Sequence, residues 1–234
     1  LKYFIKSSLT KSEPYNPRFI ESGREDILRT YDYLEHMELS GLLRKLHTAR
    51  TIYCFGTGYA QRNAVQEFAK SMQVCGKFCH VIPARNEFES TMSAMNQDDV
   101  VILVSFSGQT ENMREHVKML ALRKIPMIAI TAIGVNFMSS YAEYSLHYQT
   151  TPTQLSTQRK PYHSFVALSV LLDYIVRRYI DHVETQQRGN STKTAQVLES
   201  SEFSSETGAL DVADIRAQAG AVAIDRQHTD PSET

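Results

Sequence analysis

The stretch VVILVSFSGQT, residues 100–110, decides the fold of this chain of 234 residues. Its first five residues, Val100 to Val104, are all apolar and predict a strand buried on both faces. The next six residues supply three hydroxyl side chains and one glycine, and Glu111 then opens a predicted helix. A buried strand that passes through a short loop into a helix is the repeating unit of an α/β domain, so we expect that class of fold.

The same alternation extends to both sides of this stretch. Asn16 and Pro17 predict the start of a lead-in helix. Apolar strands separated by helices predict a mostly parallel sheet covered on both faces, which is a three-layer αβα sandwich flanked here by N-terminal helices. We predict strands at 51–55, 78–82, 100–104, 127–131 and 144–148, and helices at 39–46, 59–72, 87–95, 111–123 and 161–180.

The loop at 105–110 is predicted to bind an anion. The hydroxyls of Ser105, Ser107 and Thr110 would converge with the free backbone N–H groups at a helix start, where the helix dipole is positive. Gly108 has no Cβ and would let the backbone approach the ligand closely. In the simpler interpretation, Ser107 and Thr110 only cap the helix. A cap needs one hydroxyl, so the presence of three favours the anion site.

A second glycine-containing loop follows the strand predicted at 51–55. Residues 56–58 read GTG and precede a helix, which fits either a tight turn or ligand binding. A dinucleotide site would need a third glycine where Gln61 stands, and an acidic residue where the chain has Arg85 and Asn86. The chain also lacks the GxxxxGK[ST] signature of triphosphate binding. We therefore expect no nucleotide cofactor.

The composition argues against several other classes of protein. A net charge of −1 gives no positive field for nucleic-acid phosphates. Cys54, Cys75 and Cys79 are odd in number and lack a matching pair of ligands, so we expect reduced thiols and no metal site. No apolar run approaches the roughly 18 residues that a membrane span needs, and no leader-like segment opens the sequence. We expect a soluble, cytoplasmic protein.

The motif SFSGQT at 105–110, with GTG at 56–58 one βαβ unit earlier, resembles the SIS (sugar isomerase) fold. This fold is shared by phosphosugar isomerases and by regulators that sense phosphosugars, and the resemblance covers roughly residues 35–178. The architecture as a whole resembles the RpiR-type transcriptional regulators, which join an N-terminal helix-turn-helix domain to an effector-binding SIS domain. We therefore expect a phosphorylated sugar as the ligand.

The resemblance also implies which residues bind it. Many relatives carry a serine where this chain has Ala60, so one hydroxyl contact to the ligand is either absent or supplied by Thr57. The phosphate would be held by side chains of the second loop, completed by its backbone and faced by the first loop. The predicted ligand-binding residues are Gly56, Thr57, Gly58, Ser105, Ser107, Gly108, Gln109, Thr110 and Arg159.

The choice between enzyme and sensor depends on a catalytic base. Isomerases similar to the sedoheptulose-phosphate enzymes carry a Gln-Glu-x-His run at the head of the last helix, where this chain has QRKP at 158–161. Arg159 and Lys160 there would supply positive charge for the ligand instead. His163 and Glu67 are possible bases. We expect a non-catalytic sensor; the alternative is an aldose-ketose isomerase, and a purely structural module would not need the three hydroxyls.

The resemblance and the composition together predict three segments. Residues 1–15 would be the remnant of an upstream helix-turn-helix segment, 16–186 the SIS domain, and 187–234 a polar, poorly ordered tail or a loosely docked helix. Contact with DNA would occur only through the missing N-terminal domain. The apolar lead-in and final helices predict a homodimer or a dimer of dimers.

Overall fold

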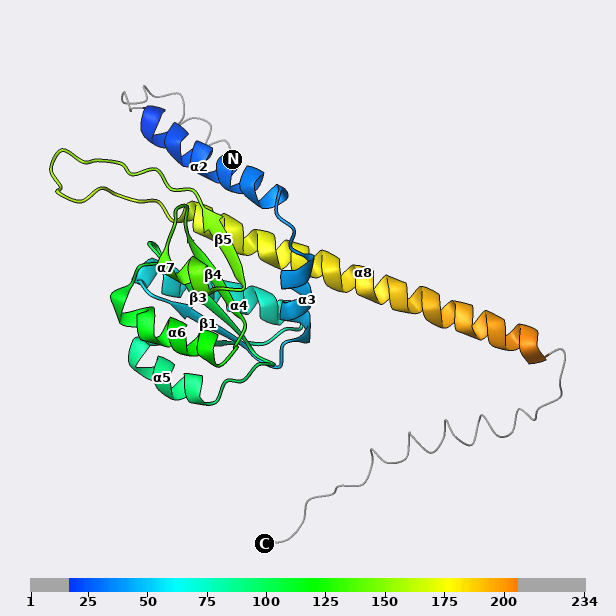
Figure 1. Cartoon of the computed structure of the whole chain (residues 1–234). Helices are drawn as coiled ribbons and strands as arrows, with labels where there is room; N and C mark the ends of the chain where they lie inside the picture. Colours follow the sequence, from blue (N-terminus) through cyan, green and yellow to red (C-terminus); the bar gives the residue numbers. More distant parts are fainter. Residues whose placement is uncertain (1–16, 206–234) are drawn as a thin grey trace, which may run out of the picture. The chain divides into compact units, whose positions relative to one another are not determined.

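A five-stranded parallel sheet organises the protein (Figure 1). The computed structural model describes residues 17–205, with side chains up to Gly189. The chain divides into two units between Val183 and Glu184, and the sheet and its layers belong to the first unit. The strands run in the order β2-β1-β3-β4-β5. Their bounds are Ile52–Gly56 (β1), Cys79–Val81 (β2), Val100–Val104 (β3), Met127–Ala132 (β4) and Tyr144–Tyr148 (β5).

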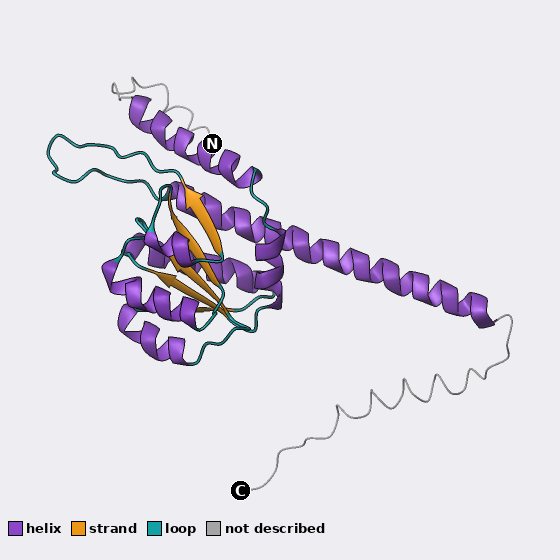
Figure 2. Ribbon diagram, in the orientation of Figure 1, coloured by secondary structure: helices purple, strands orange, loops and turns teal. Residues whose placement is uncertain are grey.

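Helices cover both faces of this sheet, as predicted for an αβα sandwich (Figure 2). The first part of α8 packs with α2, α3 and α4 on one face, and α5, α6 and α7 pack on the other. The bounds are Pro17–Glu35 (α2), Ser40–Thr48 (α3), Tyr59–Val74 (α4), Arg85–Ser93 (α5), Arg114–Leu122 (α6), Phe137–Tyr141 (α7) and Val166–Ser205 (α8), with a 3₁₀ turn, η1, at Glu111–Met113.

The register of the strands explains why the core has two halves. Cys54 on β1 aligns with Ile102 on β3, and both point into the half formed with α4 and α8. Their neighbours Tyr53 and Val101 also align and point into the half formed with α5 and α6. Side chains alternate between faces along a strand, so each apolar run supplies both halves. Burial of each large apolar side chain contributes about 1.5–3 kcal/mol.

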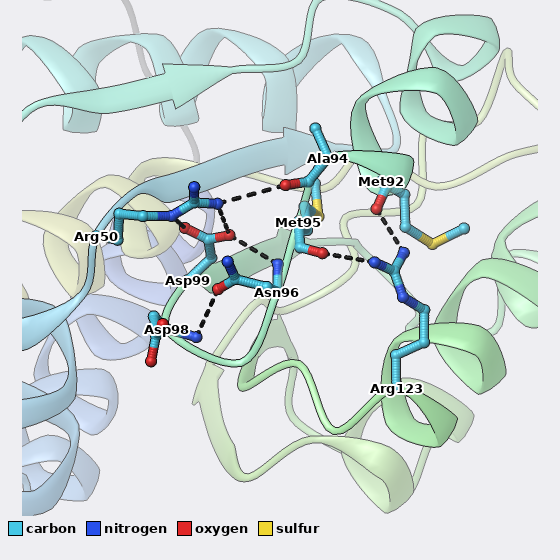
Figure 3. A network of polar contacts seen from close by, with 8 residues as sticks. All are labelled: Arg50, Met92, Ala94, Met95, Asn96, Asp98, Asp99 and Arg123. Atoms are coloured by element: carbon cyan, nitrogen blue, oxygen red, sulfur yellow. Dashed lines mark hydrogen bonds and ion pairs between the residues drawn. The ribbon is translucent and has the colours of Figure 1, made fainter.

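Polar contacts hold the elements at the amino ends of β1 and β3 (Figure 3). Arg50 donates two hydrogen bonds, of 3.0 and 2.6 Å, to the buried carboxylate of Asp99, and the Asn96 N–H donates a third to it over 2.8 Å. The guanidinium groups of Arg50 and Arg123 also donate to carbonyls at the end of α5, those of Met92, Ala94 and Met95. These contacts therefore hold the amino ends of the two strands to the end of α5.

The last helix differs from its prediction. It begins at Val166 instead of Pro161 and continues past Ile180 to Ser205. Thr153 and Tyr162 exchange two backbone hydrogen bonds of 2.9 Å, so the chain between β5 and α8 doubles back in extended form and cannot be helical there. The short helix α7 was not predicted.

The ends of the chain bear on the three predicted segments. Residues 1–15 lie outside the part that the structure describes, and so do 206–234. Helix α8 continues through residues 187–205, and the three segments and their boundaries remain predictions. Within residues 17–205, no helix combines the length and apolarity needed to cross a membrane.

Candidate functional site

The two predicted loops meet at the carboxyl ends of β1 and β3. These strands are neighbours in the sheet, and the chain continues from β1 to β2 on one side and from β3 to β4 on the other. At such a switch point the two following loops separate and leave a crevice, which is where open parallel sheets bind ligands. The topology therefore brings residues 56–58 and 105–110 together.

A row of hydroxyls joins the two loops. Thr57 donates from Oγ1 to the Oγ of Ser105 over 3.1 Å, and this oxygen lies 3.2 Å from the Oγ1 of Thr110. The N–H of Gly108 also donates to the Oγ of Ser105 over 3.2 Å. Ser105 is 1% exposed. It acts as the buried centre that fixes the loop, while Thr57 and Thr110 are only partly buried at its two sides.

The outer part of the loop carries the groups that are free to bind. Ser107 is exposed, and its Oγ accepts a hydrogen bond of 3.2 Å from the N–H of Gln109. Within residues 17–205, no acceptor takes the backbone N–H groups of Ser107, Thr110 and Glu111. These donors stand before and at the start of η1, which continues directly into α6, at the positive end of the helical segment. A loop with free N–H donors and hydroxyls in this position can bind an anion.

Gly108 is required by the shape of the loop. Its φ of +63° is in the left-handed region, and a Cβ would lie 2.1 Å from the Oδ1 of Asn136. Asn136 is buried under the loop, where Oδ1 accepts from the Ser139 N–H at the start of α7 and Nδ2 donates to the Oγ1 of Thr131. Asn136, in the connection between β4 and α7, thus supports the loop that follows β3.

The first loop has a similar steric demand. A Cβ on Gly56 would lie 2.4 Å from the backbone nitrogen of Arg62, so no side chain fits where α4 passes the end of β1. A Cβ on Gly58 would meet only the side chain of Gln61, at 2.3 Å from Oε1. Gly56 therefore serves the tight strand-to-helix turn, and Thr57 is the residue of this loop that reaches the second loop.

Two arginines that the sequence did not point to lie beside the loops. Arg62 of α4 and Arg85 of α5 line a hollow of 230 Å³ together with Thr57 and Thr110. The sequence used Arg85 only to exclude an acidic contact to a ribose. Both arginines lie in the first turns of helices, where a cation is unfavourable, and this unusual position could have indicated a binding role.

The structure does not bring Arg159 to this site. Arg159 and Lys160 are exposed in the long connection between β5 and α8, and neither has a hydrogen bond or ion pair to the loop at 105–110 among the described residues. Their expected place at the head of the last helix is wrong, because that helix begins at Val166. Positive charge at the site is supplied by Arg62 and Arg85 instead.

The two candidate bases differ in position. The ring of His163 packs edge-on against Phe106, with ring centroids 4.7 Å apart. Phe106 belongs to the loop at 105–110, which we call the cradle. The Nδ1 of His163 is buried and has no partner within the described part of the chain. Glu67 is exposed and pairs with Lys70 over 2.9 Å, on a groove between α4 and α8. Only His163 of these two therefore adjoins the loops.

The cysteines are free thiols. The pKa of Cys54 is raised well above its usual range, first by its hydrogen bond with Cys79 and then by burial, which favours the protonated form. Among the residues that the structure describes, no three His, Cys, Asp or Glu side chains gather as metal ligands do.

These loops, glycines and strands define an α/β domain with a candidate anion site, and comparison with known proteins gives its family. The SIS domain family matches residues 45–177, which is more than half of the chain. The chain therefore belongs to the SIS domain family, and the predicted fold is confirmed.

Individual relatives lie among regulators and isomerases. The HTH-type transcriptional regulator GlvR of Bacillus subtilis is 23% identical over 166 residues, which are 71% of this chain and 65% of that protein. The chain thus spans slightly less than two thirds of the length of this relative.

Solved structures share the fold. The sugar isomerase domain of an RpiR transcription factor from Sphaerobacter thermophilus superposes with a TM-score of 0.61 at 14% identity, covering 77% of this chain and 99% of that one. Vibrio vulnificus NanR in complex with ManNAc-6P gives 0.59 at 21%, covering 83% and 71%. MJ1247 of Methanococcus jannaschii, inferred to be a 3-hexulose-6-phosphate isomerase, gives 0.57 at 18%, covering 71% and 92%. The predicted SIS fold is thus shared with domains of regulators and of an isomerase.

Proposed function

We propose that this chain is the effector-sensing part of an RpiR-type transcription regulator and that its effector is a phosphorylated sugar. The observation that carries the proposal is the loop at 105–110, where free backbone N–H groups and hydroxyls meet before a helix. The relative from B. subtilis is a transcriptional regulator, and the V. vulnificus structure contains a phosphosugar. Both support a sensing role for the same fold here.

The chemistry of the loop suits a phosphate group. A phosphate offers several charged oxygens, and each accepts a hydrogen bond that is about twice as strong as a neutral one. Ser107, Thr110 and the N–H of Glu111 supply donors for them, while Gly108 keeps the loop open to the ligand. The buried Ser105 holds these donors in place.

DNA binding would belong to a helix-turn-helix domain joined to the N-terminal side of this one. The net charge of −1 gives this chain no positive field of its own for a duplex. We place the regulator in the cytoplasm, because a transcription regulator has to reach both its effector and DNA.

The second candidate function is aldose-ketose isomerisation of a phosphosugar. His163 favours it, because the imidazole adjoins the cradle loop through Phe106 and has an unpartnered buried nitrogen. Isomerisation needs a base beside the sugar carbons, and a histidine can serve as one. Turnover of a phosphosugar that is abolished in His163→Gln would establish the enzyme and replace the sensor.

Calorimetric titration of the whole chain tests the sensor. Hexose, hexosamine and pentose phosphates are compared with the same sugars without phosphate, in the native protein and in Ser107→Ala. Loss of a hydrogen bond to a charged oxygen costs about 1.5–3 kcal/mol, so affinity should fall roughly ten- to a hundredfold. Ser93→Ala is the matched control, because Ser93 is also exposed but lies at the far end of α5.

The control variant should bind as the native protein does, and both variants should unfold at the native temperature. A preferred sugar that binds equally well without its phosphate would show that the loop is no phosphate site. The same conclusion follows if Ser107→Ala leaves the affinity unchanged.

A further inference from the structure

The hollow beside the cradle has its own cationic wall. Arg62 and Arg85 come from different helices, α4 and α5, and line the same space of 230 Å³. Thr57 and Thr110 line it from the side of the cradle, so the hollow continues from the proposed phosphate site. Its volume is below that of a pocket for a whole drug-sized ligand, which suits one end of a molecule held mainly elsewhere.

The placement of these arginines works against the stability of their helices. Arg62 is the fourth residue of α4 and Arg85 is the first of α5. A cation in the first turn opposes the helix dipole, at a cost of about 0.3–1 kcal/mol each at the surface. Two helix starts and two guanidinium groups around one hollow favour an anion there. An anion in the hollow would offset this repulsion.

Neither arginine has an anion of its own. In the described part of the chain, no hydrogen bond or ion pair is formed by the guanidinium of Arg62 or Arg85. Among the described residues, four arginines do have carboxylate partners, which are Arg29 with Glu25, Arg50 with Asp99, Arg114 with Glu111 and Arg177 with Asp173. The hollow thus holds two fork-shaped donors that lack an acceptor.

The cradle has enough donors for one phosphate without them. It offers the N–H groups of Ser107, Thr110 and Glu111 and the adjoining hydroxyls. We propose that Arg62 and Arg85 form a second anion subsite, so that the effector is a phosphosugar with a further acidic group, a carboxylate or a second phosphate. The inference rests on the proposed function and adds the chemical class of the effector. Guanidinium groups bind both kinds of acid in a bidentate manner.

Two pairs of ligands test it by calorimetric titration against the whole chain. Glucose 6-phosphate is compared with 6-phosphogluconate, and fructose 6-phosphate with fructose 1,6-bisphosphate. We expect the member with two acidic groups to bind at least tenfold more tightly in one of the pairs. In Arg62→Gln and in Arg85→Gln, this advantage should shrink roughly tenfold or be lost, with little change for the partner ligand. Arg24→Gln, an exposed change on α2, should leave it intact.

The outcomes separate this inference from the proposed function. If the native chain binds the single phosphates in a manner that depends on Ser107 but gains nothing from a second acidic group, only the second subsite is wrong. The same holds if Arg62→Gln and Arg85→Gln weaken both members of a pair equally, because the arginines then bind the one phosphate. If no phosphosugar binds, both proposals fail. Circular dichroism of each variant verifies that it is folded.

Discussion

At the scale of single residues, Gly108 links the backbone of the cradle to its support. Its left-handed φ of +63° costs an alanine about 1–2 kcal/mol, and the added Cβ would also displace Asn136. We therefore expect Gly108→Ala to lower the free energy of unfolding by more than that strain alone, and to weaken phosphosugar binding. Chemical denaturation and titration measure the two effects.

Gly76 provides the control for this comparison. Its φ of +76° is equally left-handed, but a Cβ there would have no atom within 4 Å. Gly76→Ala should lose only the backbone contribution of about 1–2 kcal/mol and should bind normally. Equal losses in the two variants would mean that Asn136 gives way freely, and that the loop is not held from below.

The residues of the site differ in how far the sequence could predict them. Ser105, Ser107 and Thr110 follow one strand, so their proximity was predictable from local pattern alone. Arg62 and Arg85 are far apart along the chain and line one hollow only because β1 lies between β2 and β3. That order is a property of the sheet and is not encoded in any short motif.

At the scale of elements, the Asp99 carboxylate joins the amino ends of β1 and β3 to the end of α5. Burial alone would raise its pKa, but hydrogen bonds from Arg50 and from the Asn96 N–H outweigh it and hold the pKa below its usual range. A lowered pKa means that the ionised form stabilises the fold above the unfolded-state value of about 3.9. This contribution is lost as the pH falls through the folded value.

Asp99→Asn should therefore reduce the free energy of unfolding by about 1–3 kcal/mol at pH 7. The difference from the native protein should begin to shrink below about pH 4, where Asp99 of the unfolded chain becomes protonated, and should be lost as the pH falls through the lower pKa of the folded carboxylate. Denaturation across a pH series measures it, with the exposed neighbour Asp98→Asn as control. A deficit that stays constant down to pH 2 would show that shape and not charge makes the contact.

The bounds of a strand or helix were predictable where a single sequence pattern determined them. The strands β3 and β5 have the predicted bounds, 100–104 and 144–148, because continuous apolar or β-favouring runs end sharply at polar residues. The start of α8 was missed because Pro161 fits the first turn of a helix, whereas the backbone pairing of Thr153 with Tyr162 is a non-local contact. Five-residue α7 is too short to show a helical period.

At the scale of the whole molecule, apolar surface remains uncovered on the helices that flank the sheet. On α2, Phe19, Ile20 and Leu28 are 53%, 61% and 54% exposed, and on α8 Val166 and Ile180 are also exposed. Contiguous exposed apolar patches are typical of protein interfaces. Copies of this chain that pair through these helices would bury them in a symmetric contact.

We accordingly predict a homodimer or a dimer of dimers, which light scattering at micromolar concentration measures directly. Leu28→Glu places a charge among the exposed apolar groups of α2, where burial of an unpaired charge is costly, and should shift the mass toward that of one chain. Leu122→Glu on α6 is the control, because Leu122 is 77% exposed on the opposite side of the sheet and should leave assembly unchanged. A native protein that is monomeric at these concentrations, or a loss of assembly only in Leu122→Glu, would contradict pairing through α2 and α8.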